Sequence, residues 1–173
     1  MPALLASGRA RVVTVSSLVH KAGQIRWDDP QWEQSYQAWP AYAQSKLANL
    51  LFTYALQRRL AAAHAPVRAL ACHPGYAATE LQTAFTESGS LKDRVMRLGN
   101  RLMAQSAEAG AAPTLAAALG PDAAGGDFYG PDGLFEIWGR ARKVASAPSA
   151  REEGDQERLW ALTEGWTGLR FDL

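Results

Sequence analysis

The residues best suited to chemistry in this sequence are a tyrosine and a lysine four positions apart. Tyr42 and Lys46 lie in the stretch "WPAYAQSKLANLLF", residues 39–52, whose apolar spacing predicts a helix. Side chains at positions i and i+4 lie on one face of a helix and can meet. A phenol titrates at about pH 10, and a neighbouring ammonium favours the phenolate, as proton exchange at neutral pH requires. Tyr42 could therefore act as a general acid/base, with Lys46 adjusting its acidity.

A purely structural explanation of the same pair stays open. Tyr42 could cap the core while Lys46 extends its charged end into solvent, and such a spacing also arises by chance. The other polar residues carry weaker signals, and none of them is expected to be catalytic. The expected roles are structural for His20 and His73, a small buried residue for Cys72, and solvated carboxylates for Asp28 and Asp29.

Two predicted strands would position the tyrosine and the lysine. "RVVTVSS", residues 11–17, is typical of a buried strand in a parallel sheet, and "VRALACHPG", residues 67–75, predicts a second strand. The helix between them, about Pro40 to Ala63, completes a β-α-β unit. Ligands bind outside the carboxyl ends of parallel strands, so Ser17 and the Pro74-Gly75 turn point to the same crevice. Ser17 offers the neutral hydroxyl that holding a carbonyl oxygen requires.

The remaining segments complete an α/β pattern. Residues 18–39 predict a long ordered loop whose Trp27, Trp32 and Trp39 could either cover an apolar substrate or pack in the core. Ser106 is a predicted helix N-cap, and Pro113 is expected to kink that helix. Further elements are predicted as helices over 91–103, 106–119 and 152–162 and a strand over 127–133. The helix over 41–62 is apolar on more than one side, so we expect the sheet and another helix or subunit to cover it.

The composition is that of an ordinary globular protein. The chain has 173 residues, of which 47% are hydrophobic and 20% charged, with a net charge of +1, so we expect one domain and no nucleic-acid partner. Its single cysteine excludes an intramolecular disulfide, offers no thiolate cluster for a metal, and fits a reducing, cytoplasmic location. The opening "MPALLASGRARVV" predicts neither a signal peptide nor a membrane span.

Taken together, these stretches resemble the short-chain dehydrogenase/reductase family, and within it the retinol-dehydrogenase-like and protochlorophyllide-reductase-like members. The resemblance rests on "RVVTVSS", "AYAQSKLANLLFTYALQRRL", "HPGYAATEL" and "FYGPDG", and it covers nearly the whole chain. It implies an α/β fold, namely the carboxy-terminal part of a doubly wound Rossmann-like parallel sheet with flanking helices. It also implies hydride transfer between NADP(H) or NAD(H) and a carbonyl or alcohol of a lipophilic small molecule.

The resemblance further implies a role for each matching residue. Ser17, rather than its neighbour Ser16, would bind the reacting oxygen, and Tyr42 would be the catalytic acid/base. Lys46 would in addition hydrogen-bond the ribose next to the nicotinamide. The implied cofactor contacts are Tyr42, Lys46, Pro74, Gly75, Tyr76, Ala77 and Thr79, the last five of which would hold the nicotinamide amide and the phosphate region.

The sequence also departs from this family. A dinucleotide site needs a glycine-rich turn opening a helix, and neither G-x-x-x-G-x-G nor G-x-G-x-x-G occurs in the chain. We therefore expect residues 1–173 to be a single partial domain that holds the catalytic and substrate half and lacks the amino-terminal dinucleotide-binding half. The first strand would then sit at an exposed sheet edge. The alternative is a truncated, non-catalytic remnant that self-associates, for example as a homo-oligomer through the 41–62 helix.

Overall fold

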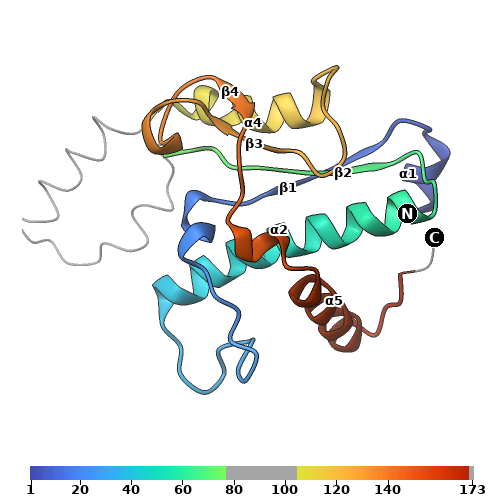
Figure 1. Cartoon of the computed structure of the whole chain (residues 1–173), viewed down its shortest axis with the longest axis vertical. Coiled ribbons are helices and arrows are strands. Elements are labelled where there is room, and N and C mark those ends of the chain that lie inside the picture. The colour runs from blue at the N-terminus through green and yellow to red at the C-terminus, as the bar shows by residue number, and fades with distance from the viewer. Residues whose placement is uncertain (77–104, 172–173) are drawn as a thin grey trace, which may run out of the picture.

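The computed structural model describes residues 1–76 and 105–171, which form an α/β fold with flanking helices (Figure 1). The 3-10 helices are labelled η. In chain order the elements are α1 (Pro2–Ala6), β1 (Arg11–Val15), η1 (Leu18–Ala22), α2 (Ala38–Ala62), β2 (Arg68–Cys72), α4 (Ala107–Leu119), β3 (Phe128–Pro131), η3 (Leu134–Glu136), β4 (Ala141–Lys143), η4 (Pro148–Arg151) and α5 (Glu153–Thr167).

The strands form one sheet in the order β1-β2-β3-β4. β1 pairs in parallel with β2, with Arg11 opposite Arg68 and Val15 opposite Cys72. β2 pairs in parallel with β3, whereas β4 is antiparallel to β3. Among the described residues, β1 lies at one edge of the sheet, as predicted, and β4 lies at the other. Because β1, β2 and β3 run the same way, their carboxyl ends share one side of the sheet.

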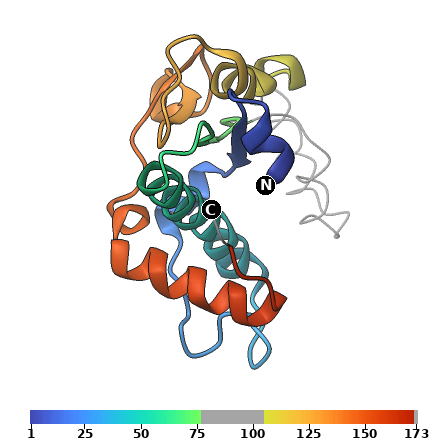
Figure 2. The ribbon, with the colours of Figure 1, turned by 90° about the vertical axis from the view of Figure 1, so that its right-hand side faces the viewer.

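Helices cover both faces of the sheet, with α2 and α5 on one side and α4 on the other (Figure 2). Successive residues of a strand point to opposite faces, and β2 shows this directly. Ala69 and Ala71 pack with residues of α2, whereas Leu70 and Cys72 pack with Ala117 of α4. The sheet and α5 thus cover α2 on two sides, which confirms the expectation drawn from its apolar surface.

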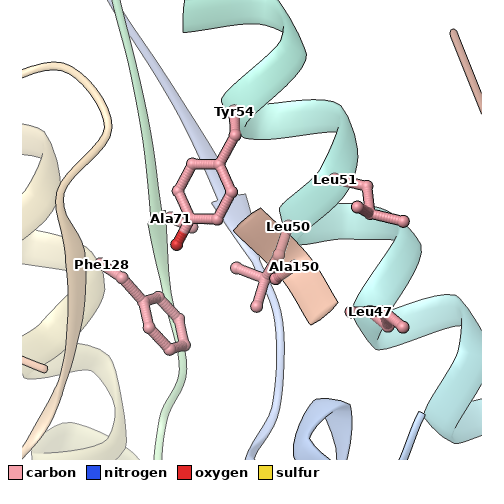
Figure 3. Close-up of a cluster of buried hydrophobic side chains, with 7 residues drawn as sticks. All are labelled: Leu47, Leu50, Leu51, Tyr54, Ala71, Phe128 and Ala150. Carbon is pink, nitrogen blue, oxygen red and sulfur yellow. The ribbon is translucent and has the colours of Figure 1, made fainter. Parts of the chain in front are cut away.

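One core cluster shows why α2 lies where it does (Figure 3). Its side chains come from one stripe of α2, from β2, from β3 and from η4: Leu47, Leu50, Leu51, Tyr54, Ala71, Phe128 and Ala150. Residues three and four apart share a helix face, so the four α2 residues form one stripe, from which Leu50 and Tyr54 point toward the sheet in Figure 3. Full burial of a leucine stabilises by about 1.5–3 kcal/mol. This stripe therefore fixes the helix that carries the tyrosine and the lysine.

Most predicted elements are confirmed, with shifted ends. The side-chain oxygen of Ser106 accepts the N–H of Ala109 at 3.1 Å, as expected of an N-cap. The helix that follows continues through Pro113, which is fully buried. α5 extends to Thr167 and is therefore longer than predicted.

Other expectations differ from the structure or lie outside it. β1 was expected to be buried, but its residues are at most half-buried and Val15 is 43% exposed, because no described strand pairs with its outer edge. β4 was not predicted, since three residues with two cations lack an apolar pattern. The predicted helix over 91–103 falls outside the described residues.

Candidate active site

The carboxyl ends of β1 and β2 are level with each other. Val15 and Cys72 are register partners, and the N–H of Ser16 donates to the carbonyl oxygen of Cys72 at 2.7 Å. Ser17 and Pro74 follow these strand ends directly. The structure therefore brings the serine and the Pro-Gly turn together at the carboxyl ends of the parallel strands, as the β-α-β pattern predicted.

Ser16 ties the end of β1 to α2. It is only 2% exposed, and its hydroxyl donates to the backbone carbonyl of Lys46 at 2.8 Å. One turn later, the amide nitrogen of Asn49 donates to the carbonyl of Val15 at 3.0 Å. These two bonds hold the strand end beside the helical turn that carries Lys46. Ser16 therefore has a structural role in joining β1 to α2.

Ser17 begins η1 and is half-buried. Its side-chain oxygen accepts the N–H of Val19 at 3.5 Å, and its carbonyl oxygen lies 2.6 Å from Nδ1 of His20. The N–H of Ala147 donates to the other ring nitrogen of His20, so Nδ1 carries the proton and donates to Ser17. Burial lowers the pKa of His20, which keeps this ring neutral. The serine is thus held by a buried, uncharged histidine, which supports the structural role expected of His20.

Tyr42 and Lys46 lie side by side on α2, and both are half-buried. The ammonium nitrogen of Lys46 lies 5.5 Å from the centroid of the Tyr42 ring, within the range of a cation–π interaction. The ring of Trp39 also approaches that of Tyr42, with centroids 6.1 Å apart. The two side chains that the helical spacing places on one face therefore meet, with the cation over the aromatic ring.

The Pro74-Gly75-Tyr76 turn is held by residues from far along the chain. Gly75 has a φ of +67°, and a Cβ there would come within 2.4 Å of the carbonyl oxygen of Ile137, so only glycine fits. The N–H of Tyr76 donates to the same carbonyl at 2.8 Å, and the Tyr76 carbonyl accepts the N–H of Gln105 at 2.9 Å. Both backbone groups of Tyr76 are therefore already engaged within the chain.

His73 connects this turn to η3. It is fully buried, and its Nδ1 accepts the N–H of Gly75 at 3.1 Å, so Nε2 carries the proton and donates to Glu136 at 3.1 Å. Glu136 also accepts from Lys21 at 2.9 Å. Burial, only partly offset by Glu136, lowers the pKa of His73 to about 4. The histidine is therefore neutral at pH 7 and acts as a buried brace, which supports the structural role expected of it.

Comparison with known proteins gives this geometry a context. No protein-family model matches the chain. It is 38% identical over 171 residues to retinol dehydrogenase 13 of Homo sapiens, with 96% of this chain and 48% of that protein covered. It is 35% identical over 167 residues to polyprenol dehydrogenase of Mus musculus, with 93% of this chain and 46% of that protein covered. The chain is a homologue of the short-chain dehydrogenases/reductases. It spans about half the length of the curated relatives it matches.

A solved structure supports the same relationship. An uncharacterised protein from Mycobacterium paratuberculosis superimposes with a TM-score of 0.73 at 42% identity, covering 95% of this chain and 53% of that one. The likeness in fold to that protein therefore extends over nearly all of this chain and about half of the solved one. Every helix in residues 1–76 and 105–171 is too short or too polar to cross a bilayer.

The structure covers most, but not all, of the residues that the resemblance to short-chain dehydrogenases singled out. Ser17, Tyr42, Lys46, Pro74, Gly75 and Tyr76 are described and belong to the β1, α2 and β2 ends. Ala77 and Thr79 lie outside the described residues. Within the described part of the chain, no group of three or more histidine, cysteine or acidic residues could hold a metal ion.

Sequence reasoning missed or misjudged three residues around the site. Glu136 and Ile137 brace the Pro-Gly turn from about sixty positions away, and no local pattern announces them. Asp29 was expected to be solvated but is only 3% exposed. Its carboxylate accepts the N–H groups of Glu33 and Gln34 at 2.8 and 3.2 Å, so it shapes the tryptophan loop from within. The aspartate followed by Pro30 was a turn signal that could have indicated this.

Proposed function

We propose that this chain is the catalytic part of an oxidoreductase of the short-chain dehydrogenase/reductase type. The proposed reaction is hydride transfer between NADP(H) or NAD(H) and a carbonyl or alcohol of a lipophilic small molecule. The observation that carries the proposal is the position of Ser16, which bonds the Lys46 carbonyl of α2 and the Cys72 carbonyl of β2, so that the ends of both strands lie beside the turn of α2 that carries Lys46. Sequence similarity to named dehydrogenases supports the same conclusion.

The proposed residues divide the work as follows. The hydroxyl of Ser17 holds the substrate oxygen, since Ser17 directly follows Ser16, whose hydroxyl bonds the Lys46 carbonyl. Tyr42 donates its hydroxyl proton to that oxygen in reduction and accepts it in oxidation. The ammonium of Lys46 stabilises the phenolate that is left behind and binds the ribose next to the nicotinamide. The bound nicotinamide supplies the hydride.

The residues present fit the nicotinamide end of the cofactor. Lys46 is half-buried beside Tyr42, and the glycine at position 75 lets the backbone turn tightly where a side chain would collide with Ile137. A contact from the Tyr76 N–H would require release of its bond to Ile137, whereas the Tyr76 carbonyl can accept a second hydrogen bond beside that from Gln105. No glycine-rich turn in this sequence could hold the pyrophosphate. We therefore propose that the chain is the catalytic and substrate half of the domain, and that the pyrophosphate binds to groups it does not carry.

A groove beside the tryptophan loop supports a lipophilic substrate. It has a volume of about 470 Å³, and its apolar lining comes from the loop, α2 and α5: Ile25, Trp32, Phe52, Leu159 and Trp166. Its polar lining comes from Gln31, Gln44, Ser45, Asn49 and Thr163. Sites for apolar small molecules likewise combine apolar and aromatic walls with a smaller number of polar groups. The relatives are named for retinol and polyprenol, both lipophilic alcohols. Ser17, Tyr42 and Lys46 are not among the described residues that line this groove, but Ala41 and Ser45, which neighbour Tyr42 and Lys46 on α2, do line it. Of the two roles considered for the tryptophan loop, we therefore favour the substrate role for Trp32.

A second candidate function is a non-catalytic module that binds another copy of itself. It is favoured by the outer edge of β1, which pairs with no described strand, and by Phe52 and Trp166, which are 39% and 47% exposed. An unpaired strand edge is a template for association. This alternative predicts oligomers that neither bind nicotinamide cofactor nor turn over substrate.

Titration calorimetry with NADPH and NADH separates the two functions. The chain should be titrated alone and together with any polypeptide encoded directly upstream, with the oligomeric state measured by light scattering in parallel. Saturable binding that is lost in Lys46→Met, with an unchanged melting temperature, is the expected result. Oligomers with no cofactor binding in either form would end the oxidoreductase proposal.

A further inference from the structure

A basic hollow lies at the amino ends of β1 and β2. The proposed active site lies at the opposite, carboxyl ends of the same strands. Its volume is about 470 Å³, and its charged lining consists of Arg9, Arg11 and Arg68. The described residues that line it include no acidic side chain. None of these three arginines belongs to an ion pair within the described part of the chain. The hollow therefore holds three arginines that have no ion-pair partner among the described residues.

Two of the arginines are direct neighbours in the sheet. Arg11 and Arg68 are the first register partners of the parallel β1–β2 pair. Like charges at such neighbouring positions repel each other and weaken strand pairing. The two arginines, with Arg9 beside them, therefore need negatively charged or polarised partners from outside the two strands.

Backbone carbonyls near the end of α4 hold two of the guanidinium groups in place. Arg11 donates to the carbonyls of Ala117 and Gly120 at 3.0 and 2.8 Å, and Arg68 donates to the carbonyl of Ala123 at 2.8 Å. The end of a helix offers only about half a negative charge, which cannot balance three full positive charges. Each guanidinium also has five N–H donors, so donors remain on both groups.

We propose that this hollow binds an oxyanion, a small molecule carrying phosphoryl or carboxylate groups. Guanidinium groups bind both kinds of group through paired, charge-assisted hydrogen bonds, and those of Arg11 and Arg68 are already oriented by α4. The volume matches that of small-molecule sites, which span about 300–1,000 Å³. The site is separate from the nicotinamide site because it lies at the opposite ends of the same strands.

Titration calorimetry of the full chain with pyrophosphate tests this site without any nicotinamide cofactor or turnover. At low, constant ionic strength we expect saturable binding that weakens about tenfold or more in Arg9→Gln and in Arg68→Gln, because each variant removes charge-assisted hydrogen bonds. Arg140→Gln, which removes an exposed arginine elsewhere, should bind within about twofold of the wild-type chain. Malonate in place of pyrophosphate tells a carboxylate ligand from a phosphoryl ligand, and preferential binding of either supports the site.

Three results would overturn the proposal. They are no saturable binding of either anion, unchanged affinity in Arg9→Gln, and an equal loss in Arg140→Gln, which would mean general surface electrostatics. Arg9 is exposed, so its variant is informative even if Arg68→Gln, which also loses the bond to Ala123, unfolds. Melting temperatures of all variants, measured in the same buffer, separate lost binding from lost folding.

Discussion

β1 and β2 are register partners of equal length, yet they differ strongly in burial and in the number of strands that pair with them. β2 lies between two strands, and four of its five residues are buried. β1 pairs on one side only within the described residues, and none of its five residues is fully buried. Both strand ends nevertheless contribute to the proposed active site. Core packing holds β2 itself, and hydrogen bonds to Ile137 and to the buried His73 hold the Pro-Gly turn after it. After β1, hydrogen bonds from Ser16 and Asn49 to backbone carbonyls position the serine.

This difference suggests how the site depends on its surroundings. The end of β2 should keep its geometry as long as the core is intact. The end of β1 depends on two hydrogen bonds to α2 and on whatever covers the outer strand edge. Backbone amides of β1 should therefore exchange with deuterium faster than those of β2. Equal protection of the two strands would contradict the comparison.

The largest effect on stability is expected in β2. Leu70→Ala removes a fully buried side chain from the cluster between the sheet and α4, and should lower the free energy of unfolding by about 2–5 kcal/mol. Urea unfolding monitored by circular dichroism measures this loss. A cost below about 1 kcal/mol would mean that the α4 side of the sheet is poorly packed.

A pH-dependent effect of about 3 kcal/mol is expected at His73. The pKa of this residue is lowered from about 6.5 in the unfolded chain to about 4 in the folded chain, so the unfolded chain binds the extra proton as the pH falls through this window. Stability should be unaffected by this group above pH 6.5, and should fall progressively toward pH 4.

His73→Gln tests this assignment. Because glutamine does not titrate, the stability of the variant should depend less steeply on pH between about 6.5 and 4 than that of the wild-type chain. His64→Asn, which replaces an exposed histidine with a residue that tolerates its positive φ, is the matched control. If the free energies of unfolding of wild type and His73→Gln vary in parallel with pH throughout this window, the assignment of a buried, neutral His73 is refuted.

A smaller effect is expected where β1 is tied to α2. Ser16→Ala leaves the Lys46 carbonyl without its hydroxyl donor and should cost about 1–2 kcal/mol. It should also increase deuterium exchange at the end of β1 more than in β2. Uniform loosening of both strands would mean that the bond serves the whole core and not the strand end.

The smallest effect is expected on the outer part of β1. Val15→Thr keeps the β-branched shape at a residue that is 43% exposed, so the free energy of unfolding should change by no more than about 0.5 kcal/mol. A loss above 1.5 kcal/mol would show that Val15 is covered in solution, for example by a second copy of the chain.

The sequence predicted those elements whose formation depends on neighbouring residues. The β-branched run of β1, the leucine stripe of α2 and the Pro-Gly stop after β2 each show in consecutive residues, and together they fix the β-α-β unit. The spacing of Tyr42 and Lys46 likewise predicts their contact on the helix.

Long-range contacts could not be predicted in this way. The bond between His73 and Glu136 joins residues 63 positions apart, and β4 is too short and too charged to show a strand pattern. Asp29 looks like a solvated carboxylate until the chain folds back and its own loop supplies N–H donors. In each case the structural role of the residue depends on a partner that becomes its neighbour only when the chain folds.

The central claim is that the phenol of Tyr42 exchanges the proton during hydride transfer. It is tested most directly by comparing the NADPH- or NADH-dependent reduction of an apolar aldehyde by wild type and Tyr42→Phe, each in the form that binds the cofactor. Tyr54→Phe, which removes a buried hydroxyl further along the same helix, is the matched control and should keep its activity. We predict that Tyr42→Phe lowers turnover by about 10²–10⁴-fold while cofactor affinity stays within a few-fold. Turnover equal to that of the wild-type chain would contradict the account.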